Sequence, residues 1–216
     1  MPQACIFDFD GIIADTELLH FQSFQTVLEA HGAGFDWETY LKVYIAFDSS
    51  QVFATAFKNA GLTDMPPMAA LIDQKVEAFE KLLENAEVPP LPGAADAVRL
   101  AAQNGPVALC TGAERRDVLP LLKGFGLLDL FQAIVTAEDV TISKPNPECY
   151  QRAASLLGIA PADCLAIEDT PGGLSAARGA GCQTLAVTTT HTREQLLDFA
   201  DIVTDSLVNF PAILAT

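Results

Sequence analysis

The feature that most constrains the fold is a series of short apolar runs that, from about residue 92, alternates with segments of helical periodicity. Most of these runs are continuous, which is typical of strands buried on both faces of a sheet. Strands are predicted at residues 4–9, 107–111, 133–136, 164–167, 184–188 and 202–204. Helices are predicted at residues 94–103, 115–123, 148–157, 173–180 and 193–200, and Pro120 is expected to kink or shorten the second. This order predicts an α/β fold with right-handed crossovers and a doubly wound parallel sheet.

The segment between the first and second predicted strands has a different character. Residues 17–87 show helical periodicity and contain no strand-like run. The proline-rich residues 88–93 lead back to the next part of the chain, and such a stiff connection is typical of a domain hinge. We therefore expect an inserted α-helical cap domain at residues 16–89, with residues 1–15 and 90–216 forming the α/β core.

The charge of the chain is strongly negative, because 12 basic residues stand against 28 acidic ones and give a net charge of −16. Such a surface repels nucleic-acid phosphates and anionic lipids, so neither nucleic acid nor a membrane is expected as a partner. A small anionic substrate is compatible with it where a metal ion, a placed lysine or helix N-termini attract the substrate locally. A monomer or a weak homodimer is expected.

The cysteines and the lack of long apolar stretches indicate the cellular compartment in which the protein works. The five cysteines are an odd number without a C-x-x-C pair, which argues against a disulfide scaffold and a zinc site. The apolar stretches are shorter than the roughly 20 residues that a membrane-spanning helix needs. The first residues lack the basic region and the apolar run of a signal peptide. We expect a cytoplasmic protein.

Pairs of carboxylates follow two of the predicted strands. Asp8 and Asp10 close the first strand, where their i, i+2 spacing places both on one side, and Gly11 follows them. Glu168 and Asp169 end a later strand. An Asx-type turn or the capping of a helix would account for either pair alone. Because ligands of open α/β sheets bind at the carboxyl ends of strands, the two pairs together predict a shared divalent cation, and oxygen ligands favour Mg²⁺.

A hydroxyl group and a lysine extend this set. Thr111 and Gly112 follow the second predicted strand, and Lys144 precedes a predicted helix. Taken singly, these residues are an ordinary helix start and a solvated charge. Together with the acids they suit phosphoryl transfer: the cation and the lysine neutralise phosphoryl charge, one carboxylate attacks phosphorus and another transfers protons.

The motifs D-x-D-G, T-G, K-P and E-D, in this order and on these elements, resemble the four motifs of the haloacid-dehalogenase-like phosphohydrolases. The branch most similar to this chain carries a helical cap after the first motif and includes phosphoglycolate phosphatases and β-phosphoglucomutases. Residues 15–20, 143–147 and 168–181 support the resemblance, which covers the whole chain. It implies a Rossmann-like core that supplies the chemistry and a cap that closes over the site.

The resemblance also implies roles for the motif residues. Asp8 would be the nucleophile that forms an aspartyl-phosphate, and Asp10 would protonate the leaving oxygen and then activate water. Thr111, Gly112 and Lys144 would hold the phosphoryl group, and Lys144 would also lessen the repulsion between the carboxylate nucleophile and an anionic phosphate.

The metal site is implied in the same way. Mg²⁺ would be bound by the carboxylate of Asp8, the backbone carbonyl of Asp10 and the carboxylate of Asp169. Glu168 would bind it either directly or through water.

These observations predict a Mg²⁺-dependent phosphatase of a small phosphorylated metabolite, such as a sugar phosphate. A phosphosugar mutase is the alternative, but it must grip a second phosphate, and residues 16–89 hold four lysines, no arginine and eleven acids. Ala113 and Glu114 stand where the mutases carry a Ser-Lys pair, although Arg115 and Arg116 can compensate from the core.

A haloacid dehalogenase is disfavoured, because halide displacement does not need Asp10 or the metal-binding acids. A non-catalytic binding module is disfavoured because the motif residues are intact.

Two residues of the predicted cap are further candidates for substrate contact. Lys75 falls where some caps lend a lysine to the substrate, with a solvated helix lysine as the alternative. His20 either sits in the cap hinge near Asp10 or packs beside Phe24.

Overall fold

The computed structural model describes residues 2–45 and 47–215, which form two compact units. The first unit joins the segment up to Asp15 to the segment from Pro89 onward, and the second is Thr16–Val88. The expected insertion of residues 16–89 differs from the second unit by one residue, because Pro89 is part of the first. Within the first unit the two connecting segments run side by side, since Ala14 forms an antiparallel bridge with Pro90.

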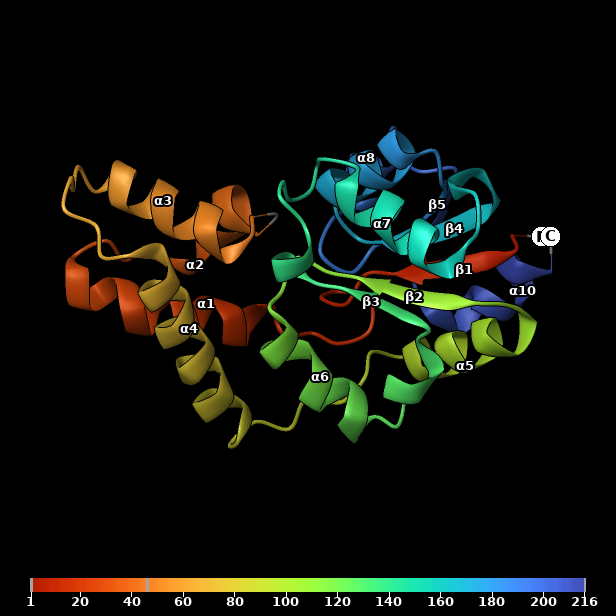
Figure 1. The fold of residues 1–216 in the computed structure, drawn as a ribbon, viewed down its shortest axis with the longest axis horizontal. Coiled ribbons are helices and arrows are strands. Elements are labelled where there is room, and N and C mark those ends of the chain that lie inside the picture. The colour runs from red at the N-terminus through yellow and green to blue at the C-terminus, as the bar shows by residue number, and fades with distance from the viewer. Residues whose placement is uncertain (1, 46, 216) are drawn as a thin grey trace. The chain divides into compact units, whose positions relative to one another are not determined.

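A six-stranded parallel sheet with the order β3-β2-β1-β4-β5-β6 lies at the centre of the first unit (Figure 1). Each predicted strand is present: β1 (Ala4–Phe7), β2 (Val107–Cys110), β3 (Ala133–Val135), β4 (Cys164–Glu168), β5 (Gln183–Val187) and β6 (Ile202–Thr204). All residues of β1, β2 and β4 are buried, as their continuous apolar runs predict. The predicted Rossmann-like α/β fold is confirmed, and its strand order reverses between β1 and β4, where such folds bind ligands.

Helices cover both faces of this sheet (Figure 1). Helices α7 and α8 pack on one face and α5 on the other, where it also contacts α10. The helices of the first unit are α5 (Ala94–Asn104), α6 (Arg115–Gly124), α7 (Glu148–Leu157), α8 (Pro171–Ala180), α9 (Arg193–Leu196) and α10 (Phe210–Leu214). Short 3₁₀ segments lie at Leu128–Leu130, Ala137–Asp139, Pro161–Asp163 and Leu207–Asn209. The sheet face below α7 is built largely of alanine and cysteine, which leaves room for the fully buried ring of Tyr150.

Two helix predictions of the core need correction. Helix α6 continues through the exposed Pro120 to Gly124, so this proline does not shorten the helix. Helix α9 ends at Leu196 rather than at residue 200.

The second unit is helical throughout its named elements. They are α1 (Glu17–Leu28), a 3₁₀ turn (Glu29–His31), α2 (Trp37–Thr39), a π-helix (Tyr40–Tyr44), α3 (Ser49–Asn59) and α4 (Met68–Leu83). Its core joins the apolar faces of α1, α3 and α4 through side chains such as Phe24, Phe53 and Leu71. Asp48 and Gln51 form a reciprocal capping box at the start of α3, in which each side chain accepts a hydrogen bond from the other residue's backbone N–H.

Two expectations from composition can be compared with this structure. In the described part of the chain, no helix has the length and apolar character required to cross a membrane. The five cysteines are all buried and carry free thiols.

Candidate active site

The register of the sheet brings two of the predicted carboxylates together. Phe7 of β1 is paired with Ile167 of β4, so the next residues, Asp8 and Glu168, emerge side by side at the carboxyl edge. The N–H of Asp8 donates to the carbonyl of Ile167 at 3.0 Å and extends the pairing by one residue. Asp8 is 8% exposed and Glu168 is fully buried. Two acids therefore lie at the point where the strand order reverses.

A third carboxylate completes this group. Asp169, which is 1% exposed, follows Glu168 directly. Each of Asp8, Glu168 and Asp169 offers one oxygen, and these oxygens lie within 4.8 Å of one another. Three buried acids at such distances repel one another strongly unless positive charge lies among them.

Glycines make the space that two of these carboxylates occupy. A Cβ on Gly11, whose φ is +71°, would lie 1.9 Å from Oδ2 of Asp169. A Cβ on Gly173, in the first turn of α8, would lie 1.9 Å from Oε1 of Glu168. Both acids thus pack directly against backbone, in cradles that a larger residue would fill.

Lys144 supplies positive charge to the acids. Its Nζ lies 2.9 Å from Oδ1 of Asp8 and 2.6 Å from Oε1 of Glu168, and it also donates to the carbonyl of Cys110 at 2.9 Å. Burial alone would lower the pKa of Lys144, but the charges of Asp8 and Glu168 outweigh it and hold that pKa well above its ordinary value. The lysine is therefore a fixed cation at neutral pH.

A single lysine does not balance the negative charge at Asp8. Burial, reinforced by the charge of Glu168, raises the pKa of Asp8 well above its ordinary value, although Lys144 acts in the opposite sense. The charge of Asp10 adds to the increase. Further positive charge at this place would favour the ionised form of Asp8, which suits a hard divalent cation with oxygen ligands.

Thr111 and Gly112 lie at the same edge of the sheet. The N–H of Thr111 donates to the carbonyl of Val135 at 2.9 Å, just beyond the end of β2. Its hydroxyl accepts a hydrogen bond from the N–H of Ala113 at 3.0 Å, and a hydroxyl that accepts in this way still carries one hydrogen to donate. Gly112 is exposed, and a Cβ there would meet nothing within 4 Å, so packing alone does not require this glycine.

Tyr150 was not anticipated from the sequence. Its hydroxyl donates to Oε1 of Glu168 at 2.9 Å, and its ring lies 5.2 Å from Nζ of Lys144. Oε2 of Glu168 accepts from the N–H of Asp169 and from both the N–H and the hydroxyl of Thr170, at 3.1–3.4 Å. Protein donors therefore contact both oxygens of Glu168.

The side chain of Asp10 does not belong to this carboxylate group, although its charge acts on Asp8. The carboxylates that lie within reach of one cation are Asp8, Glu168 and Asp169, and the side chain of Asp10 is not among them. His20 is buried and stacks on Phe79 with ring centroids 4.5 Å apart. Lys75 is 1% exposed, with Nζ 5.2 Å from the Phe79 ring, so the alternative of a solvated lysine is wrong.

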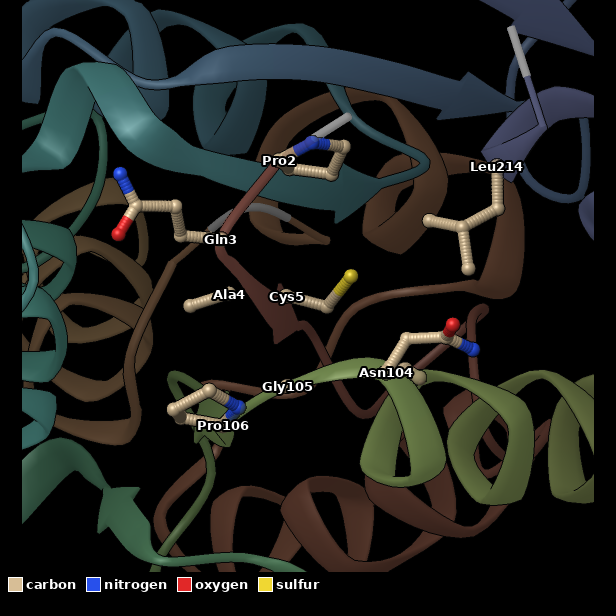
Figure 2. A pocket seen from close by; sticks show the side chains of 9 residues that line it. Pro2, Gln3, Ala4, Cys5, Asn104, Gly105, Pro106 and Leu214 are labelled. Atoms are coloured by element: carbon tan, nitrogen blue, oxygen red, sulfur yellow. The ribbon is translucent and has the colours of Figure 1, made fainter.

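A pocket at the other edge of the sheet is not part of this site (Figure 2). Residues before and within the start of β1, including Gln3 and Cys5, line it together with Asn104 at the end of α5 and Leu214 of α10. These residues lie at the amino ends of the strands, whereas the carboxylates lie at the carboxyl ends.

The model of the haloacid dehalogenase-like hydrolase family matches residues 5–187 of this chain. Fructose-1-phosphate phosphatase YqaB of Escherichia coli (strain K12) is 34% identical over 184 residues, which are 84% of this chain and 94% of that protein. CbbY from Rhodobacter sphaeroides, solved with phosphate, is 29% identical with a TM-score of 0.87, covering 96% of this chain and 95% of its own. A mutant of that protein was solved with xylulose-(1,5)bisphosphate. The β-phosphoglucomutase of Clostridium difficile shares the fold over 100% of both chains, with a TM-score of 0.84 at 21% identity.

Proposed function

Because this chain belongs to the haloacid dehalogenase-like hydrolases and is a phosphoric monoester hydrolase, we propose that it hydrolyses a small sugar phosphate through an aspartyl-phosphate on Asp8 with the aid of Mg²⁺. The observation that carries this proposal is the placement of Lys144 between Asp8 and Glu168, which form one carboxylate group with Asp169. Such a group binds and polarises a phosphoryl group beside a carboxylate nucleophile.

Asp8 is the proposed nucleophile. It directly follows β1, one of the two middle strands, and its N–H is bonded to β4, so the sheet fixes its backbone. One carboxylate oxygen attacks phosphorus, the bond to the leaving sugar oxygen breaks, and Asp10 gives that oxygen a proton. Asp10 then takes a proton from the water that attacks the aspartyl-phosphate, which releases phosphate and restores Asp8. Lys144 and the Thr111 hydroxyl bind the phosphoryl oxygens during both steps.

The residues present fit Mg²⁺. Asp8 and Asp169 would hold the ion with their carboxylates and Asp10 with its backbone carbonyl, in a buried site shaped by Gly11. When bound, Mg²⁺ supplies the positive charge that favours the ionised form of Asp8 and neutralises phosphoryl charge.

Glu168 has a different part in this proposal. Protein donors contact both of its oxygens, and the shortest of these contacts, at 2.6 Å, comes from Lys144. A carboxylate offers about four lone-pair sites, so these donors leave little capacity for a direct contact with the ion. We assign Glu168 to fixing the position of Lys144 and to reaching the ion through water.

The substrate class rests on the relatives. YqaB is named for fructose 1-phosphate, and a CbbY mutant was solved with a sugar bisphosphate. Initial rates of phosphate release from a panel of sugar phosphates, phosphoglycolate and phosphoserine, each with and without Mg²⁺, test this class. The proposal expects kcat/KM to be highest for a sugar phosphate. Equal rates for all compounds, or hydrolysis of phosphoglycolate alone, would contradict the substrate class and leave the phosphatase assignment in place.

A phosphatase is favoured over a mutase by the arginine at the start of α6. The guanidinium of Arg115 forms an ion pair with Asp139, whose carboxylate also accepts from the backbone and the hydroxyl of Thr136. The guanidinium of Arg115 is thus already paired, which leaves Arg116 as the remaining arginine of α6 that could contact a second phosphate. The equivalent stretch of the second unit, which carries an arginine in mutases, forms the capping box of Asp48 and Gln51.

Product identity separates the two activities. Adding a sugar 1,6-bisphosphate should not accelerate the turnover of a sugar 1-phosphate, because residues 16–89 hold no arginine and Arg115 is paired with Asp139, so a second phosphate would be held weakly. Free phosphate should equal the sugar released, as measured by a phosphate assay together with ³¹P NMR. Bisphosphate-primed formation of a sugar 6-phosphate with little free phosphate would establish the mutase instead.

Replacing Gly11 by alanine tests the cradle around Asp169. The left-handed φ of +71° should cost an alanine about 1–2 kcal/mol, and its Cβ would displace the Asp169 carboxylate. Gly126→Ala is the matched control, because Gly126 has a φ of +65° and no atom within 4 Å of the added Cβ. In urea unfolding, the strained φ should lower the free energy of unfolding of both variants by a similar amount, and that of Gly11→Ala should fall further. Only Gly11→Ala should lose most of its phosphatase activity. Equal activity in the two variants would contradict this account.

A further inference from the structure

The loop after β5 contributes a side chain to the acidic cluster that the sequence motifs do not include. β5 pairs with β4 so that Ala186 lies opposite Glu168, and the chain after Val187 therefore emerges next to Asp169. There the hydroxyl of Thr190 lies 2.6 Å from Oδ2 of Asp169 and 3.2 Å from its backbone carbonyl. The same hydroxyl lies 2.9 Å from Nδ1 of His191.

The direction of these hydrogen bonds follows from the number of hydrogens. A hydroxyl carries one hydrogen, and a carboxylate oxygen can only accept. The Thr190 hydrogen therefore points to Asp169, and Thr190 Oγ1 accepts from His191. This requires the neutral imidazole of His191 to carry its hydrogen on Nδ1.

The methyl group of Thr190 lies near Gly11, as the Asp169 carboxylate does. A Cβ on Gly11 would lie 3.2 Å from Cγ2 of Thr190 and 1.9 Å from Oδ2 of Asp169. Gly11, the Asp169 carboxylate and the Thr190 side chain therefore meet in one place, where the hydrogen bond from Thr190 orients Oδ2.

We propose that Thr190 is a positioning residue for the divalent-cation site: its hydroxyl, oriented by His191, holds Asp169 in the rotamer that binds the ion. This inference rests on the proposed function, because it takes Asp169 to be a metal ligand. Carboxylates that bind metals are themselves held by hydrogen bonds, and removal of such a partner typically weakens metal affinity or activity by about 10–100-fold.

Three variants of the full chain isolate the hydroxyl. Thr190→Val keeps the branched shape and removes the donor, whereas Thr190→Ser keeps the donor and removes the methyl group. Thr189→Val is the matched control, because Thr189 is an exposed neighbour outside this hydrogen-bond network. Mg²⁺ is titrated into metal-free protein by isothermal calorimetry, with the Mg²⁺-induced shift in Tm as a second readout.

The proposal expects the Kd for Mg²⁺ to rise about 10–100-fold in Thr190→Val, while Thr190→Ser and Thr189→Val stay within about threefold of the wild type. A folded Thr190→Val protein that binds Mg²⁺ like the wild type would overturn the role of Thr190 and leave the proposed function standing. A wild-type protein that binds no Mg²⁺ would overturn both this inference and the metal part of the proposed function.

Ring ¹⁵N chemical shifts of His191 test the direction of the network independently of the metal. At about pH 8, where an ordinary histidine is neutral, the wild type should show the Nδ1–H tautomer. The Nε2–H tautomer would mean that the Thr190 hydroxyl donates to His191 rather than to Asp169, and it would overturn the proposal.

Discussion

The Asp8→Asn variant is expected to lose at least about a thousand-fold in kcat while keeping its fold, because a neutral amide cannot attack phosphorus. The stability of the metal-free protein should stay equal or rise, since burial and Glu168 already disfavour the charge of Asp8. Phosphate release under saturating Mg²⁺ and thermal melts of metal-free protein measure both effects.

Asp15→Asn is the matched control for this variant, because Asp15 is an exposed carboxylate seven positions further on. Its kcat should stay within about twofold of the wild type, as expected for a surface change outside the site. A folded Asp8→Asn protein that keeps more than a few per cent of wild-type kcat, measured free of contaminating phosphatase, would remove Asp8 as the nucleophile.

Replacing Lys144 by methionine should have the largest effect on stability. The change leaves Asp8 and Glu168 buried without the cation that contacts both, and breaking a buried ion pair in this way typically costs about 3–5 kcal/mol. Because the folded-state pKa of Asp8 is raised above its unfolded value, and would rise further without Lys144, the variant should regain stability as the pH falls from about 8 to 5. Urea denaturation of metal-free protein across this pH range measures the free energy of unfolding.

Two further variants test whether the loss of stability in Lys144→Met comes from its ion pairs with Asp8 and Glu168. Lys123→Met, at an exposed lysine of α6, should change the free energy of unfolding by no more than about 0.5 kcal/mol. The double variant Asp8→Asn with Lys144→Met should be more stable than Lys144→Met alone, because one of the unpaired carboxylates is gone. An unchanged stability in Lys144→Met, or no recovery in the double variant, would contradict the assigned charge balance.

The sheet and the carboxylate cluster were predictable for a simple physical reason. Strands buried on both faces give continuous apolar runs, and the carboxyl ends of parallel strands meet at one edge. Asp8 and Glu168 could therefore be placed together from the sequence, before the pairing of Phe7 with Ile167 was known.

Tyr150 and Thr190 could not be predicted in this way. Each contacts the cluster through a helix or loop whose position depends on the three-dimensional packing of the sheet. A tyrosine in a helix and a threonine in a loop are ordinary residues there, and their contacts with Glu168 and Asp169 became visible only in the structure.

For Lys75, the helical spacing in the sequence indicates a buried side chain, whereas the residue type favours a solvated one. Lys75 lies four residues after Leu71 and four before Phe79, on the buried stripe of α4, although lysine is usually solvated. Helical spacing indicated the correct side, and the structure buries the lysine beside the rings of Phe24 and Phe79.

The most direct test of the central claim is the chemical identity of the phosphorylated enzyme. Wild-type protein with Mg²⁺ and an aryl phosphate is quenched in acid during the first turnover, and its peptides are analysed by mass spectrometry. The account predicts a hydroxylamine-sensitive phosphoryl group on the peptide that contains Asp8, formed before phosphate is released and absent from Asp8→Asn. Phosphate release without a phosphorylated peptide, or a phosphoryl group on any other residue, would contradict it.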